Sequence, residues 1–309
     1  MGQTGAGVTG ADMGGEQEQE QEQAEPSTVL ANGLEARLRR DEDGWMLRID
    51  EVVQSHVGEP GARLRLALQR WMQAATLATA EERGWTAPRA LHLGGAAMSF
   101  PRALQHDLPD AVQAVIEPST ELVAFLTEHI PLPEGIAVRD DDGRAALAAA
   151  APEHELVTID VFAGGTIPAP FTTVECFEAA RDALAPGGLL LVNSADGGDL
   201  AFLRSELATL RAVFGEVAIV TRGSTLVGIR HGNVLLLGSD APLPLEAIAA
   251  VVRDDDPPAG VLGWDRLERF VAEGDHGIRR DATATDVPMP DDPNYPYDEV
   301  PSLPESLQP

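Results

Sequence analysis

The sequence predicts an α/β protein whose main domain is a mixed, mainly parallel sheet with helices on both faces, preceded by a small β-hairpin subdomain. Three observations predict this class. Almost wholly apolar strand segments alternate with amphipathic helical segments, a shorter region of alternating apolar and polar residues comes before them, and two glycines follow the first apolar strand. Strands that are apolar on both sides require a covering layer on each face of the sheet.

Both ends of the chain lack the apolar residues that a folded core needs. The first segment is Gly-rich and then alternates Glu with Gln, whereas the last segment is crowded with Pro and acids. We therefore expect disordered acidic tails at 1–27 and 281–309. The remainder divides into a small N-terminal β subdomain at 28–60 and a main α/β domain at 61–280.

The elements are expected in a regular order along the chain. The region 28–56 reads as short β segments around the turn at DEDG, and a helix follows over 62–82 because apolar residues recur there at three and four spacings. The predicted strands cover 89–93, 111–117, 134–140, 155–162, 188–193, 216–220 and 230–239, the last forming an edge hairpin with STLVGI. The predicted helices cover 98–107, 119–129, 171–185, 198–213, 243–252 and 263–273.

Composition excludes several classes of partner. The net charge is −28, the tails together hold 13 acids and no base, and every one of the 22 basic residues is Arg. An acidic body without a basic stripe argues against nucleic acid and anionic membranes. No apolar run is long enough to span a bilayer and no signal peptide is recognisable, so we expect a cytoplasmic protein.

Metal and thiol chemistry are not expected. The seven histidines are scattered without an HxH or HExxH spacing, and Cys176 is the single cysteine. Its neighbours place Cys176 on an amphipathic helix, where it is expected to be a small buried residue.

The glycine turn after the first strand of the main domain is the first candidate binding feature. Gly94 and Gly95 allow a ligand to approach the backbone closely, and Glu117 ends the second strand 22 residues beyond Gly95. An acid about 20 residues after such a turn is suited to the ribose hydroxyls of an adenosine group. A tight strand-to-helix turn is the alternative reading of the glycines taken alone.

Two further strand ends supply acids. Asp142 and Gly143 end the short third strand, where a carboxylate could meet an adenine amino group, although a plain acidic turn explains them equally well. Asp160 ends the fourth strand, and there a carboxylate can hold a cation or accept a proton.

With these residues in place, the chain resembles the spermidine synthase family, the aminopropyltransferases on a Rossmann-like class I methyltransferase fold with a seven-stranded sheet. The resemblance covers about Gly33 to Asp240 and rests on LHLGGAAMSFPRAL, VIEPS, DDGR, TIDVFAGGTIPAPFTT and LAPGGLLLVN, in the order of the family. The β segments that end in DEVVQSHV resemble the family's hairpin domain, and Gln54 falls where the family keeps a substrate-side glutamine.

The resemblance implies a function and a set of site residues. Decarboxylated S-adenosylmethionine, or S-adenosylmethionine itself, would be the co-substrate, without a metal, and a putrescine-like amine would be the acceptor. Asp160 and Gln54 would be the catalytic residues. The nucleoside would be bound by Gly94, Gly95, Glu117, Asp142 and Gly143. Hairpin domains of this family often pair subunits, so a homodimer is one expectation.

Three positions depart from the family pattern. Ala96 stands where the glycine loop usually has a further glycine, Ala163 replaces the second acid of the catalytic loop, and Leu68 replaces an acceptor-side tyrosine. These changes leave two alternatives open: methyl transfer from S-adenosylmethionine to another small molecule, and a binding module without turnover.

Overall fold

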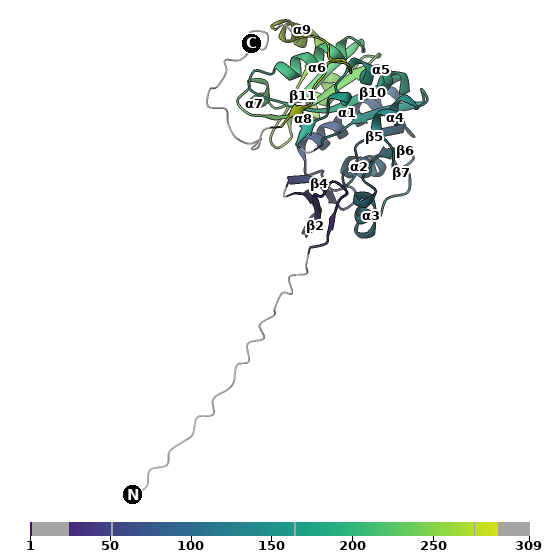
Figure 1. Cartoon of the computed structure of the whole chain (residues 1–309), viewed down its shortest axis with the longest axis vertical. Helices are drawn as coiled ribbons and strands as arrows, with labels where there is room; N and C mark the ends of the chain where they lie inside the picture. Colours follow the sequence, from purple (N-terminus) through teal and green to yellow (C-terminus); the bar gives the residue numbers. More distant parts are fainter. Residues whose placement is uncertain (2–24, 51, 164, 275, 290–309) are drawn as a thin grey trace.

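The computed structural model describes Met1 and residues 25–289 apart from 51, 164 and 275. Most of the predicted tails at 1–27 and 281–309, namely residues 2–24 and 290–309, lies outside the described residues. Figure 1 shows a small β layer, formed by the first strands, beside a larger α/β body.

The small layer is a four-stranded antiparallel sheet in the order β1-β2-β3-β4. Its strands are β1 (Ser27–Val29), β2 (Glu35–Asp41), β3 (Gly44–Ile49) and β4 (Val52–Gly58). Gly44 joins β2 to β3 with a φ of 153°, and a Cβ there would lie 2.1 Å from the carbonyl oxygen of Val57. The predicted N-terminal β-hairpin subdomain is confirmed as part of the fold.

In the described chain the large sheet has eight strands in the order β13-β11-β12-β10-β8-β5-β6-β7. The five strands from β10 to β7 are parallel to one another, while β12 is antiparallel to both of its neighbours. The strands are β5 (Arg89–Leu93), β6 (Val112–Ile116), β7 (Ile136–Arg139), β8 (His154–Ile159), β10 (Leu184–Asp196), β11 (Glu216–Thr221), β12 (Gly232–Ser239) and β13 (Gly260–Gly263). The seven predicted strands are present, and β13 adds an eighth at the edge.

The predicted edge hairpin is wrong in its details. STLVGI forms no strand, because residues Gly223–Leu226 make the short helix α7. Strand β12 instead lies between β10 and β11. The strand is wholly apolar over Val234–Leu237, which suits this central position because both of its faces are buried.

Helices cover both faces of the large sheet. One face is covered by α1 (Ala67–Arg83), α2 (Ser99–Asp107) and α8 (Leu245–Arg253), and the other by α4 (Gly143–Ala148), α5 (Val174–Ala183), α6 (Ala201–Arg211) and α9 (Trp264–Ala272). The helix α3 (Thr120–His129) packs mainly on the small sheet. Short α4 was not expected from the sequence.

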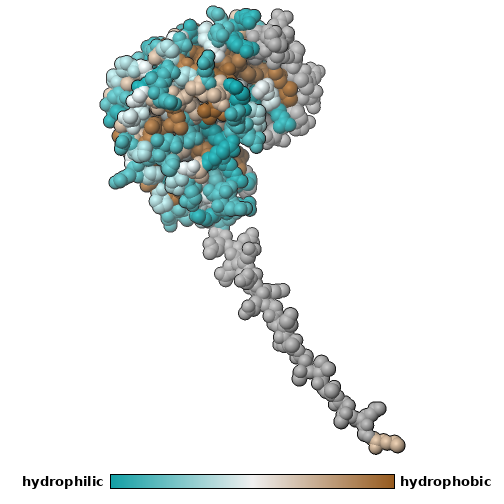
Figure 2. All heavy atoms as spheres, turned by 180° about the vertical axis from the view of Figure 1, so that it is seen from behind, coloured by the Kyte–Doolittle hydropathy of each residue, from teal (hydrophilic) through white to brown (hydrophobic). Residues whose placement is uncertain are grey.

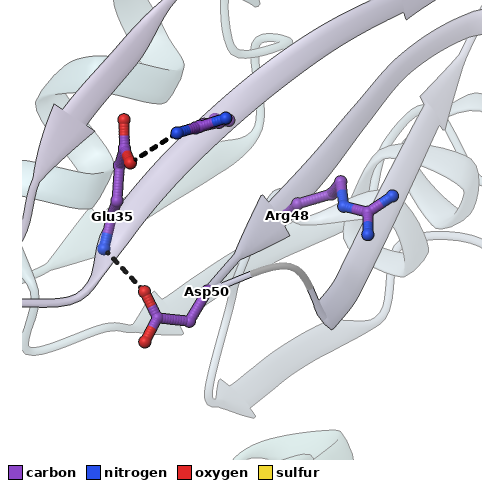
Figure 3. Close-up of a pocket in the computed structure, with 4 residues that line it drawn as sticks. Glu35, Arg48 and Asp50 are labelled. Carbon is purple, nitrogen blue, oxygen red and sulfur yellow. Dashed lines mark hydrogen bonds and ion pairs between the residues drawn. The ribbon is translucent and has the colours of Figure 1, made fainter.

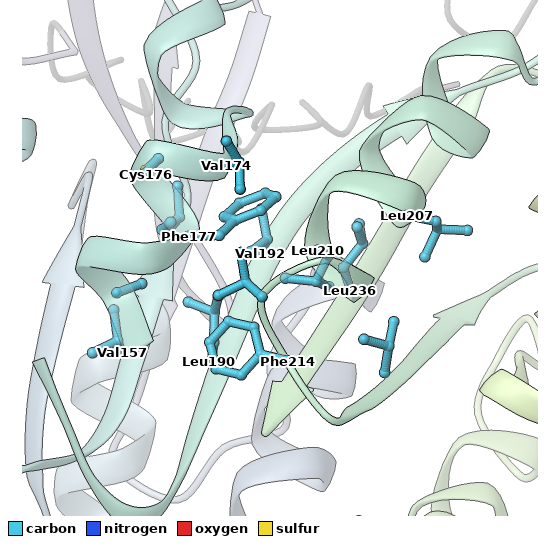
Figure 4. Packing of buried hydrophobic residues seen from close by; sticks show 14 of the residues in the cluster. Val157, Val174, Cys176, Phe177, Leu190, Val192, Leu207, Leu210, Phe214 and Leu236 are labelled. Carbon is cyan, nitrogen blue, oxygen red and sulfur yellow. The ribbon is translucent and has the colours of Figure 1, made fainter. Parts of the chain in front are cut away.

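Alternating side chains of the central strands enter two separate cores. In β10, Leu189 and Leu191 join the core under α1 and α8, whereas Leu190 and Val192 join the core under α5 and α6. This is the two-residue period of a strand that is buried on both faces. Figure 4 shows the second core, in which Cys176 lies among apolar side chains. Cys176 is fully buried, and burial raises the pKa of its thiol to about 12, so the expectation of a buried residue is confirmed.

The small sheet is attached to the body through a shared apolar cluster. Leu38 and Leu47 from the sheet pack with Phe125 and Leu126 of α3, and the same cluster includes Ala97 from the turn after β5. The glycine turn is therefore fixed from two sides, by its own strand and by the N-terminal sheet.

The C-terminal segment departs from the expected boundary of the tail. Residues 281–289 were assigned to an extended tail, yet Asp281 is hydrogen-bonded to Thr173 and Val287–Pro288 form the short strand β14. β14 pairs antiparallel with β9 (Thr166–Ile167), which follows Asp160 closely in the chain. The Pro and acid content of this segment excludes helix but not edge pairing.

The face of the body seen in Figure 2 is mainly polar. Hydrophilic residues cover most of the face seen in Figure 2, with hydrophobic residues gathered in smaller patches between them. Within the part of the chain that the structure describes, no helix has the length and apolar character needed to cross a membrane.

Candidate functional site

The turn after β5 depends on the absence of a side chain at Gly94. This residue has a φ of 82°, and a Cβ built on it would lie 2.1 Å from the carbonyl oxygen of Asp160. Its N–H donates to the carbonyl oxygen of Ile116 at 3.0 Å. Only glycine fits here without moving the backbone, because both the conformation and the space exclude a Cβ.

Gly95 and Glu117 are brought together at the ends of neighbouring strands. The N–H of Gly95 donates to Oε2 of Glu117 at 3.2 Å, and the N–H of Ser119 donates to Oε1 at 3.1 Å. A Cβ on Gly95 would lie 2.8 Å from Cγ1 of Val115, so the turn also fits closely against β6. The Glu117 carboxylate is thereby held beside the glycine turn, while its side chain stays partly exposed.

Ala96 continues the turn in a conformation that usually favours glycine. Its φ is 39°, and Met98, which precedes the first residue of α2, has a φ of 58°. A left-handed conformation costs an alanine about 1 kcal/mol. Ala96 packs against the cluster of the small sheet, so its methyl group regains part of that cost.

Asp142 and Gly143 begin a helix rather than end a strand. Strand β7 ends at Arg139, and Oδ1 of Asp142 accepts the N–H of Ala145 at 2.8 Å as the N-cap of α4. A Cβ on Gly143 would lie 3.2 Å from the Phe171 ring and 3.9 Å from Cβ of Leu93. The expectation that these residues terminate the third strand is corrected, but they do lie beside the end of β5.

Asp160 follows β8 directly and is held by an amide chain. Its N–H donates to the carbonyl oxygen of Leu93 at 2.9 Å, and its Oδ1 accepts Nδ2 of Asn193 at 2.7 Å. Nδ2 of Asn233 in turn donates to Oδ1 of Asn193 at 3.0 Å. Because Asn233 binds its oxygen, the Asn193 amide is oriented with its NH₂ group toward Asp160.

The two asparagines were missed by the sequence reasoning. Asn193 follows four apolar residues in the segment LLLVN of β10, directly beside β8, the strand that Asp160 follows. A polar residue at that place was a usable signal. Asn233 could not have been found, because the position of β12 next to β10 was not predicted.

The surroundings of Asp160 favour its neutral form more than water does. Burial raises the pKa of the carboxyl group, and the hydrogen bond from Asn193 opposes that rise. Protein atoms surround the carboxyl group densely, although part of the residue surface stays open to solvent. A carboxylate with a raised pKa is a stronger base than one in water.

The loop after Asp160 makes a tight turn where the family has its second acid. Ala163 and Thr166 exchange two backbone hydrogen bonds of 3.0 Å, and the Thr166 hydroxyl donates to the carbonyl oxygen of Ala163 at 2.7 Å. Leu68, at the start of α1, is buried in the apolar core with Trp71 and Met72. Neither position offers a charged or hydroxyl group to a substrate.

Gln54 occupies a bulge of the small sheet. Leu47 pairs with Ser55 and Arg48 pairs with Val53, so Gln54 is the extra residue between them. Bulges redirect side chains and are common next to functional sites. No hydrogen bond joins Gln54 to Asp160 within the described chain, so its catalytic role stays a prediction.

Two surface hollows lie away from these residues. One, of about 280 Å³, is on the small sheet and is lined by Glu35, Arg37, Arg48 and Asp50 (Figure 3). Glu35 pairs with Arg37 at 2.8 Å and donates its N–H to Asp50 at 3.2 Å, and the hydrogen bond from Arg37 lowers the pKa of Glu35. The other is a groove between α1 and α8. None of the predicted site residues lines either hollow.

The glycine turn, Glu117 and Asp160 thus meet at the carboxyl ends of adjacent parallel strands, where doubly wound sheets bind their ligands. Together with the strand order, this defines the class: a Rossmann-like methyltransferase fold to which an N-terminal β-hairpin sheet has been added.

Comparison with known proteins identifies the family. No family model matches the chain. A probable spermidine synthase of Corynebacterium glutamicum has a solved structure that is 30% identical with a TM-score of 0.77, covering 86% of this chain and 99% of that one. The chain belongs to the spermidine synthase family.

Two further comparisons set limits on this likeness. The chain is 31% identical over 228 residues to a probable polyamine aminopropyl transferase of Bifidobacterium longum, covering 60% of this chain but only 51% of that protein. It therefore spans about half the length of that curated relative. The spermidine synthase of Thermotoga maritima is similar in fold alone, with a TM-score of 0.52 at 14% identity, covering 74% of this chain and 77% of that one.

Proposed function

We propose that this protein is an aminopropyltransferase that binds decarboxylated S-adenosylmethionine and transfers its aminopropyl group to a polyamine such as putrescine. One observation carries the proposal: the Glu117 carboxylate is hydrogen-bonded to Gly95, while the neighbouring Gly94 lies against the main chain of Asp160. A nucleoside-binding acid and a candidate base are thereby joined through a single turn. The names of the relatives support the same reaction.

The residues at the carboxyl ends of β5, β6 and β7 fit an adenosine group. Each carboxylate oxygen of Glu117 accepts one main-chain N–H and keeps the capacity to accept a ribose hydroxyl. Gly94 and Gly95 present backbone without side chains at the place where the nucleoside would lie. Asp142 and Gly143, at the start of α4, would lie along the adenine.

Asp160 fits the role of general base. The acceptor amine must be unprotonated to attack the methylene carbon next to the sulfonium. A C–N bond then forms as the C–S bond breaks, the electron pair returns to sulfur as methylthioadenosine leaves, and the proton of the amine passes to Asp160. The raised pKa of Asp160 favours acceptance of this proton, and Asn193 keeps the carboxylate oriented. Gln54 would contact the substrate from the small sheet.

Titration calorimetry of the full chain tests the proposal. The ligands are decarboxylated S-adenosylmethionine, S-adenosylmethionine and methylthioadenosine, each with and without putrescine, and product formation is followed in parallel. We expect the decarboxylated donor and methylthioadenosine to bind more tightly than S-adenosylmethionine. Preference for S-adenosylmethionine would instead indicate methyl transfer, and binding of none of the three would remove the enzymatic function.

A further inference from the structure

The chain after α9 runs back over the helices that cover one face of the large sheet. The carbonyl oxygen of Gly277 accepts the hydroxyl of Ser205 at 2.8 Å, and the N–H of Arg279 donates to Thr209 at 2.9 Å, both on α6. The carbonyl oxygen of Arg279 accepts the N–H of Val174, at the start of α5, at 2.9 Å. We call residues 277–289 the C-terminal strap.

The side chain of Arg279 fixes the strap to the end of the loop that follows Asp160. Its Nε donates to the hydroxyl of Thr172 at 2.9 Å, and its Nη2 donates to the carbonyl oxygen of Thr285 at 2.9 Å. The guanidinium also lies over the Phe202 ring, 4.9 Å from its centroid. One side chain thus joins both halves of the strap to the loop and to α6.

Asp281 links the strap to two helices at once. Its carboxylate accepts the hydroxyl of Thr173, the N-cap of α5, at 2.6 Å and Nη2 of Arg144 on α4 at 3.0 Å. Its N–H donates to Glu175 at 3.0 Å. Because α4 begins at Gly143, Asp281 ties the strap to the helix that carries the adenine-side residues of the proposed site.

The end of the strap pairs directly with the loop after Asp160. In addition to the β14 and β9 pairing, Oδ1 of Asp286 accepts the N–H of Ala169 at 2.8 Å, and the N–H of Met289 donates to the carbonyl oxygen of Gly165 at 2.8 Å. β9 has only two residues, which is too short to be stable alone. Without the strap, main-chain groups between Gly165 and Ala169 lose these partners.

We propose that the C-terminal strap is a positioning element of the site, in which Asp286 holds the loop after Asp160 and Asp281 holds the start of α4 and α5. This role rests on the proposed function, because the two sides that the strap joins are the candidate base and the candidate adenine site. Both aspartates act through their contacts with the loop and the helices, and we assign them as positioning residues.

The test compares four variants of the full chain, of which Asp281→Ala is used for binding of methylthioadenosine. Asp286→Ala removes the acceptor for the Ala169 N–H, whereas Asp286→Asn keeps an oxygen that can accept it. Asp110→Ala changes an exposed acid in the turn before β6 and is the control. Hydrogen exchange of residues 165–173 is measured together with kcat and KM for decarboxylated S-adenosylmethionine and putrescine.

We expect Asp286→Ala to raise exchange in 165–173 about tenfold and to lower kcat by about the same factor, because one hydrogen bond to a charged group is lost. Asp286→Asn, whose neutral oxygen accepts more weakly than a carboxylate, should lie between the wild type and Asp286→Ala in both measurements, and Asp110→Ala should stay close to the wild type. Asp281→Ala is expected to weaken methylthioadenosine binding several-fold, since it frees α4.

Unchanged exchange in Asp286→Ala would overturn the contact between strap and loop, and increased exchange with unchanged kcat and KM would reduce the strap to a purely structural element. If the wild type binds no adenosine-containing ligand, the proposed function fails and with it the link to a site. The exchange data then still decide whether the strap orders the loop.

Discussion

The carboxyl edge of the large sheet contains two regions that are built in different ways. The glycine side, residues 94–119, is held by hydrogen bonds between its own neighbouring strand ends, such as that from Gly95 to Glu117. The loop side, from Asp160 to Thr173, is held by Asn193 and by the C-terminal strap, more than 100 residues farther along the chain in the case of Asp281. A binding motif can therefore be local, whereas the candidate base depends on the whole tertiary fold.

Two of the three departures from the family pattern, Ala96 and Ala163, fall on these two regions, one on each. On the glycine side, Ala96 keeps the left-handed turn that a glycine would adopt. On the loop side, Ala163 forms a tight turn with Thr166 and contributes no acid. The departure on the glycine side thus leaves the turn in place, and under the proposed function the loop side is where acceptor recognition would change.

The largest expected effect is on turnover and separates the two regions. Asp160→Asn removes the base but keeps an oxygen that can accept the Asn193 amide. General base catalysis contributes roughly 10²- to 10⁴-fold, so turnover of decarboxylated S-adenosylmethionine with putrescine should fall by that factor. Affinity for methylthioadenosine should stay within several-fold, because the glycine side is unchanged. Wild-type turnover in this variant would exclude Asp160 from the mechanism; Asp110→Asn serves as the control.

A second change tests the point where the regions touch. Gly94→Ala places a Cβ 2.1 Å from the main-chain oxygen of Asp160, and backbone atoms cannot move aside cheaply. We expect the free energy of unfolding to fall by about 3 kcal/mol, from the strain at positive φ together with the clash. The matched variant Ala96→Gly should change it by less than about 1 kcal/mol, because relief of strain is offset by added chain entropy. Equal stabilities of the two variants in urea unfolding would contradict this account of the turn.

The sequence was sufficient for the glycine side because its features are local. Apolar periodicity located the strands, and the spacing from Gly95 to Glu117 placed both at neighbouring strand ends. The loop side was only half predictable. Asp160 was found from its strand, but Asn233 depends on β12 being inserted beside β10, and Asp286 lies in a segment whose composition is that of a tail. Contacts between segments that are distant in the chain produce no local pattern of apolar residues, so the sequence does not predict them.

A buried acid behind the loop side should make stability depend on pH. Glu206 on α6 is fully buried, its carboxylate accepts the hydroxyl of Ser194, and burial raises its pKa to about 7. The pKa of nearby Asp196 is itself raised by burial to about 6. The Asp196 carboxylate disfavours the negative charge of Glu206, whereas Arg279 of the strap favours it. Cys176 stays neutral nearby because its pKa is about 12.

The direction of this pH dependence follows from the number of protons that Glu206 binds in the native and unfolded states. Between pH 4.5, the ordinary pKa of a glutamate, and about pH 7, Glu206 is protonated in the native state but ionised in the unfolded chain. Its contribution to the free energy of unfolding is therefore complete below pH 4.5 and is lost as the pH rises to about 7. Glu206→Gln removes this loss, and its free energy of unfolding should exceed that of the wild type by an amount that grows by about 3 kcal/mol from pH 4.5 to pH 8. Urea unfolding at pH 4.5, 6 and 8 measures the difference in free energy of unfolding between Glu206→Gln and the wild type. If the free energies of both proteins change with pH in the same way, Glu206 does not titrate in this range.

The smallest effect is expected for the acid of the glycine side. Glu117→Gln keeps one oxygen acceptor but loses the charge that strengthens hydrogen bonds from ribose hydroxyls, and affinity for methylthioadenosine should fall about tenfold. At saturating donor kcat should be unchanged, because Asp160 keeps its own support from Asn193. Glu121→Gln, an exposed acid in the first turn of α3, is the matched control and should bind as the wild type does. A loss in kcat without a loss in affinity would mean that Glu117 acts on the loop side, and that the two regions are coupled through the turn at Gly94 and Gly95 more strongly than their separate contacts indicate.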